Sequence, residues 1–242
     1  MSAAPAARWG PWTTVLWAGA VMALFVAVQS AFAVIYLAAT VGPRGAERAA
    51  QEMERITRNG DVLAVVTFLS APACLLALFV IVKLKRGATL EDSLALRLPD
   101  PRALGRWMLA LIAFAALSDG LTWLLGKPIV PEFMEQAYRS ADGKGALWIA
   151  LLIAAPAFEE VFFRGFVITG LAASRLGASG AILLASLAWA SIHTQYDAYG
   201  IATVFALGIL LGAARVKTRS IATPIAMHMA ANLIATAQVA FL

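Results

Sequence analysis

The chain has 242 residues, of which 61% are hydrophobic and only 14% are charged. A soluble domain carries about 45–50% apolar and about 25% charged residues, and the mean hydropathy here is +0.79. This composition excludes a disordered chain, a nucleic-acid-binding arm and an ordinary cytosolic globule, and it predicts a polytopic membrane protein. The net charge of +5 is expected to reflect membrane topology, and the single cysteine, Cys74, excludes a disulfide framework and a cysteine-based zinc site.

Seven apolar segments come near the roughly 20 residues that a transmembrane helix needs. In chain order they are about 12–40, 62–82, 104–125, 146–171, 178–193, 199–214 and 221–242. No set of strands with period two is present, so we expect an all-α bundle of about seven to eight transmembrane helices. An eighth helix or a re-entrant piece would come from a break in the fourth segment at Gly165 or Gly170.

Basic residues define the expected orientation, because they collect in cytoplasmic loops. With a cytoplasmic N-terminus, the inner side holds eleven of them: Arg8, Lys83, Lys85, Arg86, Arg97, Arg102, Arg106, Arg175, Arg215, Lys217 and Arg219. The outer side holds seven: Arg44, Arg48, Arg55, Arg58, Lys127, Arg139 and Lys144. We therefore expect a protein of the cell (inner) membrane, with its N-terminus in the cytoplasm and its C-terminus on the outer side. Residues 44–58 mix both signs at helical spacing and predict a solvated helix with i,i+4 ion pairs.

The informative residues of a membrane protein are the ionisable groups inside its apolar segments. Each costs about 2.5–3.5 kcal/mol at the centre of a helix, so it is kept where other groups satisfy it. The candidates here are Asp119, Glu159, Glu160, Arg164, His193 and His228, with Asn232 as a polar neighbour. Asp119 stays outside the predicted site, either as a partner for an active-site group or as an interfacial cap.

Three of these groups lie in the string Ala-Pro-Ala-Phe-Glu159-Glu160-Val-Phe-Phe-Arg164-Gly. Glu160 and Arg164 are about 40° apart around a helix and are expected to pair along one face. Glu159 lies about 100° from Glu160 and points elsewhere, which leaves a spare carboxylate. The alternative is a structural helix contact in which both glutamates compensate Arg164.

His228 and Asn232 are also four residues apart, so they share a helix face and can donate two hydrogen bonds into a cavity. The competing interpretation is polar contact between helices, which small-residue membrane helices use often. The other histidine, His193, follows Trp189 by four residues at the end of the fifth segment. A lone histidine there is more often an interfacial group than a catalyst.

A carboxylate, two imidazoles and an amide can together activate water. A glutamate in an apolar site can act as general base, one histidine can share its proton, and the other histidine and the amide can stabilise an oxyanion. Glu159, His193 and His228 can instead hold a divalent metal such as zinc, whose bound water is the nucleophile. The sequence lacks HExxH, GxSxG and a glycine-rich phosphate loop, and Cys74 has no charged neighbour to make a thiolate.

The motifs Glu159-Glu160-x-x-x-Arg164, Trp189-x-x-x-His193 and His228-x-x-x-Asn232, in that order, resemble those of the CPBP family of intramembrane proteases. That family includes the type II CAAX prenyl endopeptidases and the bacterial Abi proteins. The resemblance covers roughly residues 104–242 and predicts a protease core there, preceded by N-terminal transmembrane helices and a cytoplasmic loop over 1–103. The second motif usually begins with phenylalanine, and Trp189 retains a bulky aromatic wall at that position.

The resemblance implies a helical membrane fold with catalytic groups inside the bundle. Glu159 resembles the catalytic glutamate, which activates the attacking water together with the second-motif histidine, here His193. His228 and Asn232 resemble the pair that stabilises the oxyanion. The family has been described both as glutamate-type and as metal-dependent, and the residues allow either.

Glu160 and Arg164 complete the first motif, with an expected supporting role in orienting Glu159. The leading hypothesis is an intramembrane endopeptidase whose partners are membrane lipids and a membrane-associated peptide or protein substrate, not nucleic acid. One alternative is a non-enzymatic membrane scaffold or immunity-type protein that keeps the motifs for packing. A less favoured alternative is a proton-coupled transporter in which Glu159 and His193 relay protons, but the sequence shows no inverted repeat.

Overall fold

The computed structural model describes residues 9–41 and 45–241, and within these residues it contains helices and no strand. In chain order the elements are α1 (Pro11–Thr40), α2 (Ala46–Thr57), α3 (Gly60–Leu84), α4 (Leu90–Leu94), α5 (Pro101–Leu124), α6 (Glu132–Ser140), α7 (Lys144–Ile149), η1 (Ala150–Ala154), α8 (Ala155–Glu159), η2 (Glu160–Val167), α9 (Ile168–Leu171), α10 (Gly177–Ser191), α11 (Ala198–Thr218) and α12 (Ala222–Phe241). The predicted all-α bundle is confirmed. Arg8 and Arg44, which entered the charge count, and Leu242 lie outside the described residues.

Six helical stretches in the described residues are long and apolar enough to cross a membrane. They are α1, α3, α5, the continuous stretch Lys144–Leu171, α11 and α12. The remaining predicted segment is also helical, but α10 has only 15 residues. One face of α10 packs against α11, α9 and η2, whereas Leu183, Leu184 and Leu187 on its other side are exposed.

The fourth predicted segment does not break at either glycine. The helix runs without interruption from Lys144 to Leu171, and it alternates between α-helical turns and the wider π-helical turns of η1 and η2. Both glycines instead allow close approach of neighbouring elements. A Cβ at Gly165 would lie 3.1 Å from the carbonyl oxygen of Leu94, and a Cβ at Gly170 would overlap the side chain of Thr14.

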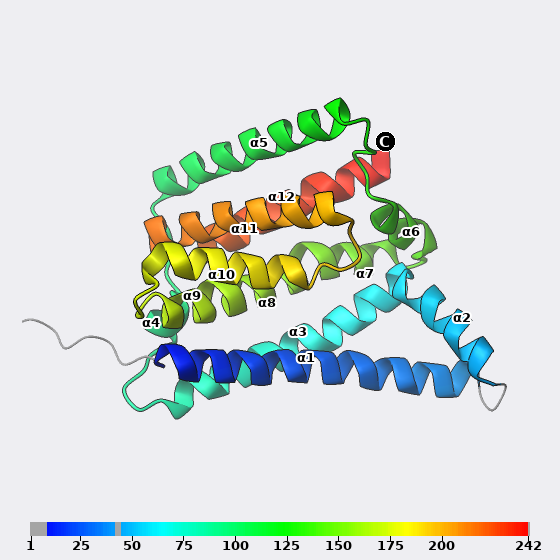
Figure 1. Ribbon diagram of the computed structural model, residues 1–242, viewed down its shortest axis with the longest axis horizontal. Coiled ribbons are helices and arrows are strands. Elements are labelled where there is room, and N and C mark those ends of the chain that lie inside the picture. Colours follow the sequence, from blue (N-terminus) through cyan, green and yellow to red (C-terminus); the bar gives the residue numbers. More distant parts are fainter. Residues whose placement is uncertain (1–8, 42–44, 242) are drawn as a thin grey trace, which may run out of the picture.

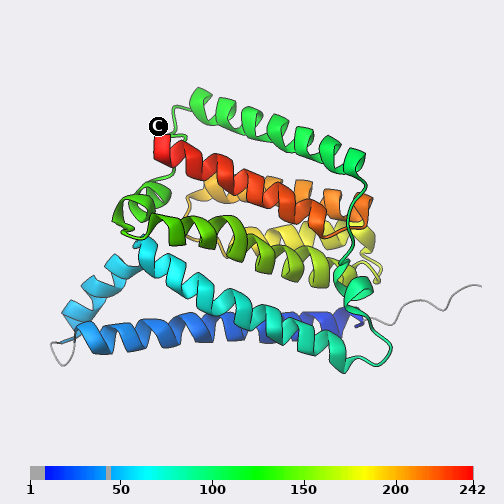
Figure 2. The ribbon, with the colours of Figure 1, turned by 180° about the vertical axis from the view of Figure 1, so that it is seen from behind.

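The Lys144–Leu171 stretch is the central element of the bundle (Figure 1). On one side α3 contacts α7, η1 and α8, and α1 packs on α3 at the edge. On the other side α10 packs on α11, α11 on α12, and α12 on α5, which forms the opposite edge (Figure 2). Side chains of the central stretch therefore reach helices from both halves of the chain.

Aromatic side chains of the central stretch build the main core. Phe158 and Phe162 stack with ring centroids 5.7 Å apart, and Phe162 meets Phe163 edge-on at 4.8 Å. Phe25 of α1 stacks on Phe158 at 5.6 Å. Cys74 of α3 is fully buried in the same core, where it acts as the expected small hydrophobic residue.

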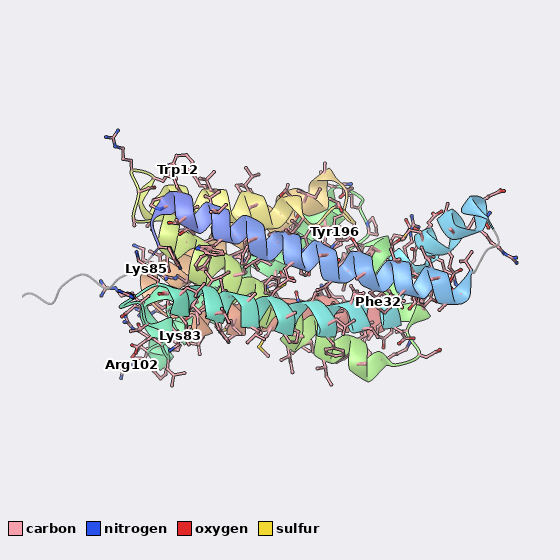
Figure 3. All side chains as sticks on the ribbon, turned by 90° about the horizontal axis from the view of Figure 1, so that it is seen from below. Trp12, Phe32, Lys83, Lys85, Arg102 and Tyr196 are labelled. Atoms are coloured by element: carbon pink, nitrogen blue, oxygen red, sulfur yellow. The ribbon has the colours of Figure 1, made fainter. Side chains whose placement is uncertain are left out.

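Three of the basic residues assigned to the inner side lie at one end of the bundle. Figure 3 shows Lys83, Lys85 and Arg102 together at the end of the bundle where α1 begins, near Trp12, whereas Phe32 lies toward the other end. This clustering is consistent with the charge asymmetry on which the expected orientation rests.

The polar segment after the first span forms α2, as its charge pattern predicts. Arg58 pairs with Glu54 at 3.8 Å with the expected i,i+4 spacing, and Arg55 pairs with Glu52 at 3.7 Å with i,i+3 spacing. Because three of these four side chains are largely exposed, the pairs contribute little to stability, and the helix is held mainly by its place between α1 and α3.

We predict that Gly170→Ala destabilises the bundle by about 1–3 kcal/mol, because the new methyl group must displace the buried Thr14 and push α1 away from α9. Unfolding of the purified protein in detergent measures the change. Gly120→Ala in α5 is the matched control, since a Cβ there meets nothing within 4 Å. Equal stability of the two variants would show that α1 does not pack closely on α9.

Candidate active site

The central stretch directs two adjacent glutamates to different helices. Glu159 ends α8 and Glu160 begins η2. Successive residues point about 100° apart around a helix, so Glu159 reaches Trp189 on α10 whereas Glu160 reaches His228 on α12. The two carboxylates therefore lie in different surroundings although they are neighbours in the sequence.

Glu160 belongs to a buried ion cluster with Arg164 and His228. Its Oε1 accepts a hydrogen bond from Arg164 Nη1 at 2.9 Å and one from His228 Nδ1 at 2.8 Å. The side chains of Glu160 and Arg164 are 0% exposed, and that of His228 is 5% exposed. The pair expected from the four-residue spacing is present, and α12 supplies a third member that the spacing did not indicate.

Trp189 on α10 joins this cluster to the other predicted residues. The indole is 2% exposed, and its Nε1–H donates to Glu159 Oε2 at 2.6 Å. The guanidinium of Arg164 lies over the indole, 4.1 Å from the ring centroid. The rings of His193 and His228 meet the indole edge-on, with centroids 5.1 and 5.2 Å away. Four predicted site residues thus surround one side chain.

The hydrogen-bond partners of the two histidines define where their protons lie. His193 Nδ1 is 2.8 Å from the backbone carbonyl oxygen of Trp189. A carbonyl only accepts, so Nδ1 carries the hydrogen and Nε2 keeps a lone pair in the neutral ring. His228 Nδ1 faces the carboxylate of Glu160 and donates to it.

The loop after α10 carries His193 and is tied to neighbouring elements. Tyr196 stacks on His193 with ring centroids 6.1 Å apart, and Phe133 of α6 meets Tyr196 edge-on at 6.2 Å. Lys127, beyond α5, donates to Asp197 at 2.7 Å. Burial raises the pKa of Tyr196 to about 12, and the hydrogen bond from Lys127 lowers the pKa of Asp197. At neutral pH the tyrosine is therefore neutral and the aspartate is ionised.

The two remaining polar residues of the spans make contacts between helices. Asn232 Nδ2 donates to the backbone carbonyl oxygen of Leu151 in η1 at 2.8 Å, which ties α12 to the central stretch. An amide nitrogen carries two hydrogens, so the second remains able to donate elsewhere. Asp119 on α5 accepts a hydrogen bond from Gln238 of α12 at 2.7 Å. Asp119 is thus a packing contact between α5 and α12.

The metal-binding alternative depends on how these side chains are grouped. Within residues 9–41 and 45–241, no three His, Cys, Asp or Glu side chains are grouped so that they could hold a metal ion. Glu159 is hydrogen-bonded to Trp189 and His228 to Glu160, so the possible ligands Glu159, His193 and His228 are held by different partners. The possible metal site at these residues stays a prediction.

Two residues of the site were not recognised as contributors from the sequence. Trp189 was interpreted only as an aromatic wall, although its replacement of the usual phenylalanine was visible and adds a hydrogen-bond donor. Tyr196 lies three residues after His193, and no spacing rule for helices applies across that loop. Its contact with the histidine follows from the fold of the loop against α6.

Comparison with known proteins agrees with the motifs. Residues 143–234 match the family model of Rce1-like type II CAAX prenyl endopeptidases. The chain contains an Rce1-like domain. This domain begins in the turn before α7 and ends in α12, so it includes Glu159, Trp189, His193, His228 and Asn232. No curated protein and no solved structure matches the chain.

The six apolar helices indicate a multi-pass integral membrane protein, and residues 143–234 are similar to a family of peptidases. The match lies wholly inside the predicted protease core of residues 104–242. The earlier start of that core, which adds α5, stays a prediction.

Arg164→Met is predicted to destabilise the protein by about 3–5 kcal/mol, because it leaves Glu160 as a buried charge without its cation. The double variant Glu160→Gln/Arg164→Met should be less destabilised than Arg164→Met alone, since it removes both charges. Chemical unfolding in detergent gives both values.

Arg139→Met is the control, because the Arg139–Glu135 pair on α6 is exposed and contributes little. A double variant as unstable as Arg164→Met, or a single variant as stable as the control, would contradict the prediction.

Proposed function

We propose that the chain is an intramembrane endopeptidase in which Glu159 and His193 activate a water molecule for attack on a peptide bond. The observation that carries this proposal is the indole of Trp189, which brings Glu159, His193 and His228 into one contact group. A base, a proton-sharing imidazole and a second imidazole around one buried indole are groups that can carry out amide hydrolysis. The Rce1-like domain supports the same reaction class.

Glu159 is suited to act as the general base. Its Oε2 is occupied by the indole N–H, which leaves Oε1 to accept a proton from water. His193 presents the lone pair of Nε2, because its Nδ1–H is held by the Trp189 carbonyl, and it offers a second acceptor for the same water. Glu159 ends α8 and His193 lies in the loop after α10, and both are half-buried whereas Glu160 is fully buried, so solvent reaches them more readily than it reaches Glu160.

Glu160 is not suited to that role. Its Oε1 accepts from Arg164 and His228, and its Oε2, which has no hydrogen-bond partner among the described residues, is buried in a side chain that is 0% exposed. A proton taken from water would cost Arg164 its counter-ion inside the bundle. Glu160 therefore supports the site by holding Arg164 and orienting His228.

His228 and Asn232 complete the reaction at the substrate carbonyl. Attack of the water oxygen on the carbonyl carbon moves negative charge to the carbonyl oxygen, while Glu159 takes the water proton. The ring of His228, held through Nδ1 by Glu160, and the second amide hydrogen of Asn232 stabilise that oxyanion. Collapse of the intermediate breaks the C–N bond, and the proton held by Glu159 passes to the departing amine.

We further propose that the N-terminus is cytoplasmic and that the substrate is a membrane-associated peptide or protein. The clustering of Lys83, Lys85 and Arg102 at the end where α1 begins supports this orientation. The site lies within the bundle and not in a separate soluble domain, so a substrate must approach from the membrane or its surface.

Glu159→Gln is predicted to lower the rate of peptide hydrolysis by about 100-fold or more, because an amide accepts no proton from water. The rate is measured on a library of internally quenched peptides with the purified protein in detergent or in liposomes. Glu135→Gln on α6 is the matched control and should leave the rate unchanged.

Full activity of Glu159→Gln would remove this glutamate from the proposed role. A wild-type protein that is folded and hydrolyses no peptide would favour the scaffold alternative, and proton-driven uptake in the same liposomes would favour the transporter.

Chelation with EDTA is predicted to leave the rate unchanged, because Glu159, His193 and His228 are held by different partners and form no ligand group. The measurement pairs the hydrolysis rate with the metal content of the dialysed protein. Loss of activity on dialysis, followed by recovery with added Zn²⁺, would contradict the prediction.

A further inference from the structure

The indole of Trp189 does more than fill space between helices. We propose that Trp189 is a positioning residue that holds Glu159 in place for water activation and supports the rings of both histidines. This role deepens the proposed peptidase function and depends on it. Phenylalanine, the usual residue at the start of this motif, can supply the ring but not the indole N–H.

The hydrogen bond to Glu159 is the first observation that supports this role. The indole nitrogen donates only, and here it lies 2.6 Å from Oε2 in a buried position. A hydrogen bond to an ionised carboxylate is roughly twice as strong as a neutral one. One oxygen of Glu159 is therefore fixed, and the other oxygen faces a defined direction.

The second observation is that the ring itself is held from two sides. The guanidinium of Arg164 covers one part of the indole at 4.1 Å from its centroid, which is within the range of a cation–π contact. Arg164 is in turn held by Glu160. The ion cluster thus fixes the plane of the indole, and the indole fixes Glu159.

The third observation is that α11 leaves room for this ring. A Cβ at Gly208 would lie 3.1 Å from Trp189 Cε3 and 2.9 Å from the Cβ of Ser186, both closer than ordinary contacts. The backbone carbonyl of Gly208 also lies 3.5 Å from Arg164 Nη2. Glycine at this position lets α11 approach α10 closely enough to support both the indole and the guanidinium.

The rings of the two histidines contact the same indole. His193 and His228 come from different elements, and each meets the indole edge-on, at interplanar angles of 78° and 76°. Trp189 therefore joins the loop after α10 to α12. A phenyl ring is smaller than an indole and supplies less of this contact surface.

The decisive variant is Trp189→Phe, which keeps an aromatic ring and removes the N–H. We expect kcat to fall about tenfold or more with little change in KM, because the lost hydrogen bond orients the base and does not bind substrate. Trp9→Phe is the matched control. Trp9 Nε1 donates to the carbonyl oxygen of Ile81 at 3.1 Å, remote from the site, so the control loses an indole hydrogen bond without a change in kcat.

A second variant moves the ring and keeps every polar group. Gly208→Ala is expected to lower kcat as well, because the added methyl group crowds Trp189 Cε3. Gly105→Ala in α5, where a Cβ meets nothing within 4 Å, should leave kcat unchanged. Thermal unfolding of all four variants checks that the loss of rate is not a loss of folded protein.

The contact with Glu159 is also measured without activity. The indole N–H resonance of Trp189, assigned by its disappearance in Trp189→Phe, should move upfield in Glu159→Gln, because a neutral amide is a weaker acceptor than a carboxylate. The resonance of Trp9 serves as the internal reference and should not move.

The outcomes separate the two proposals. The positioning role is overturned if the folded Trp189→Phe variant has the kcat of the wild type. It is also overturned if the indole N–H resonance of Trp189 does not shift in Glu159→Gln. Both outcomes leave the proposed function intact. Absence of hydrolysis by the wild-type protein overturns the proposed function, and the positioning role with it, even where the resonance still reports the hydrogen bond.

Discussion

A fully buried arginine inside a membrane bundle is the constraint on which the rest of this structure depends. Arg164 costs several kcal/mol at the centre of a helix unless neighbouring groups satisfy its charge and its hydrogen-bond donors. Here the central stretch supplies Glu160, α11 supplies the carbonyl of Gly208, and α10 supplies the face of Trp189. Three elements converge on one guanidinium, and α12 joins them through His228, which shares the same carboxylate oxygen.

This convergence separates the roles of two neighbouring glutamates. Glu160 is committed to Arg164 and His228, so its charge is balanced and it is closed to solvent. Glu159 points to α10, where Trp189 donates one hydrogen bond and leaves the other oxygen available. Arg164, whose charge would otherwise be costly in the membrane, pairs with Glu160. Through its contact with the Trp189 indole, Arg164 also helps to hold Glu159 in position.

The close contacts in the central stretch depend on its backbone. The π-helical turns of η1 and η2 carry more residues per turn than an α-helix, and such turns often occur at functional sites. In η1 the carbonyl of Leu151 accepts from Asn232, which ties α12 to the stretch. Gly165 and Gly170 let α4 and α1 approach closely. A wider helix with small residues at its contacts allows polar groups from several neighbours to meet inside an otherwise apolar bundle.

The sequence by itself determined that this is a helical membrane protein, which apolar segments are helical, and that Glu160 pairs with Arg164. These follow from composition, from segment length and from spacing along one helix, all of which are local properties. Only the tertiary structure decided that His228 binds Glu160 and that Asp119 contacts Gln238. It also showed that Trp189 is a hydrogen-bond donor to Glu159 and not merely an aromatic wall. These contacts join residues 30 or more positions apart in the sequence, and helical periodicity does not determine which helices lie side by side or how they are rotated.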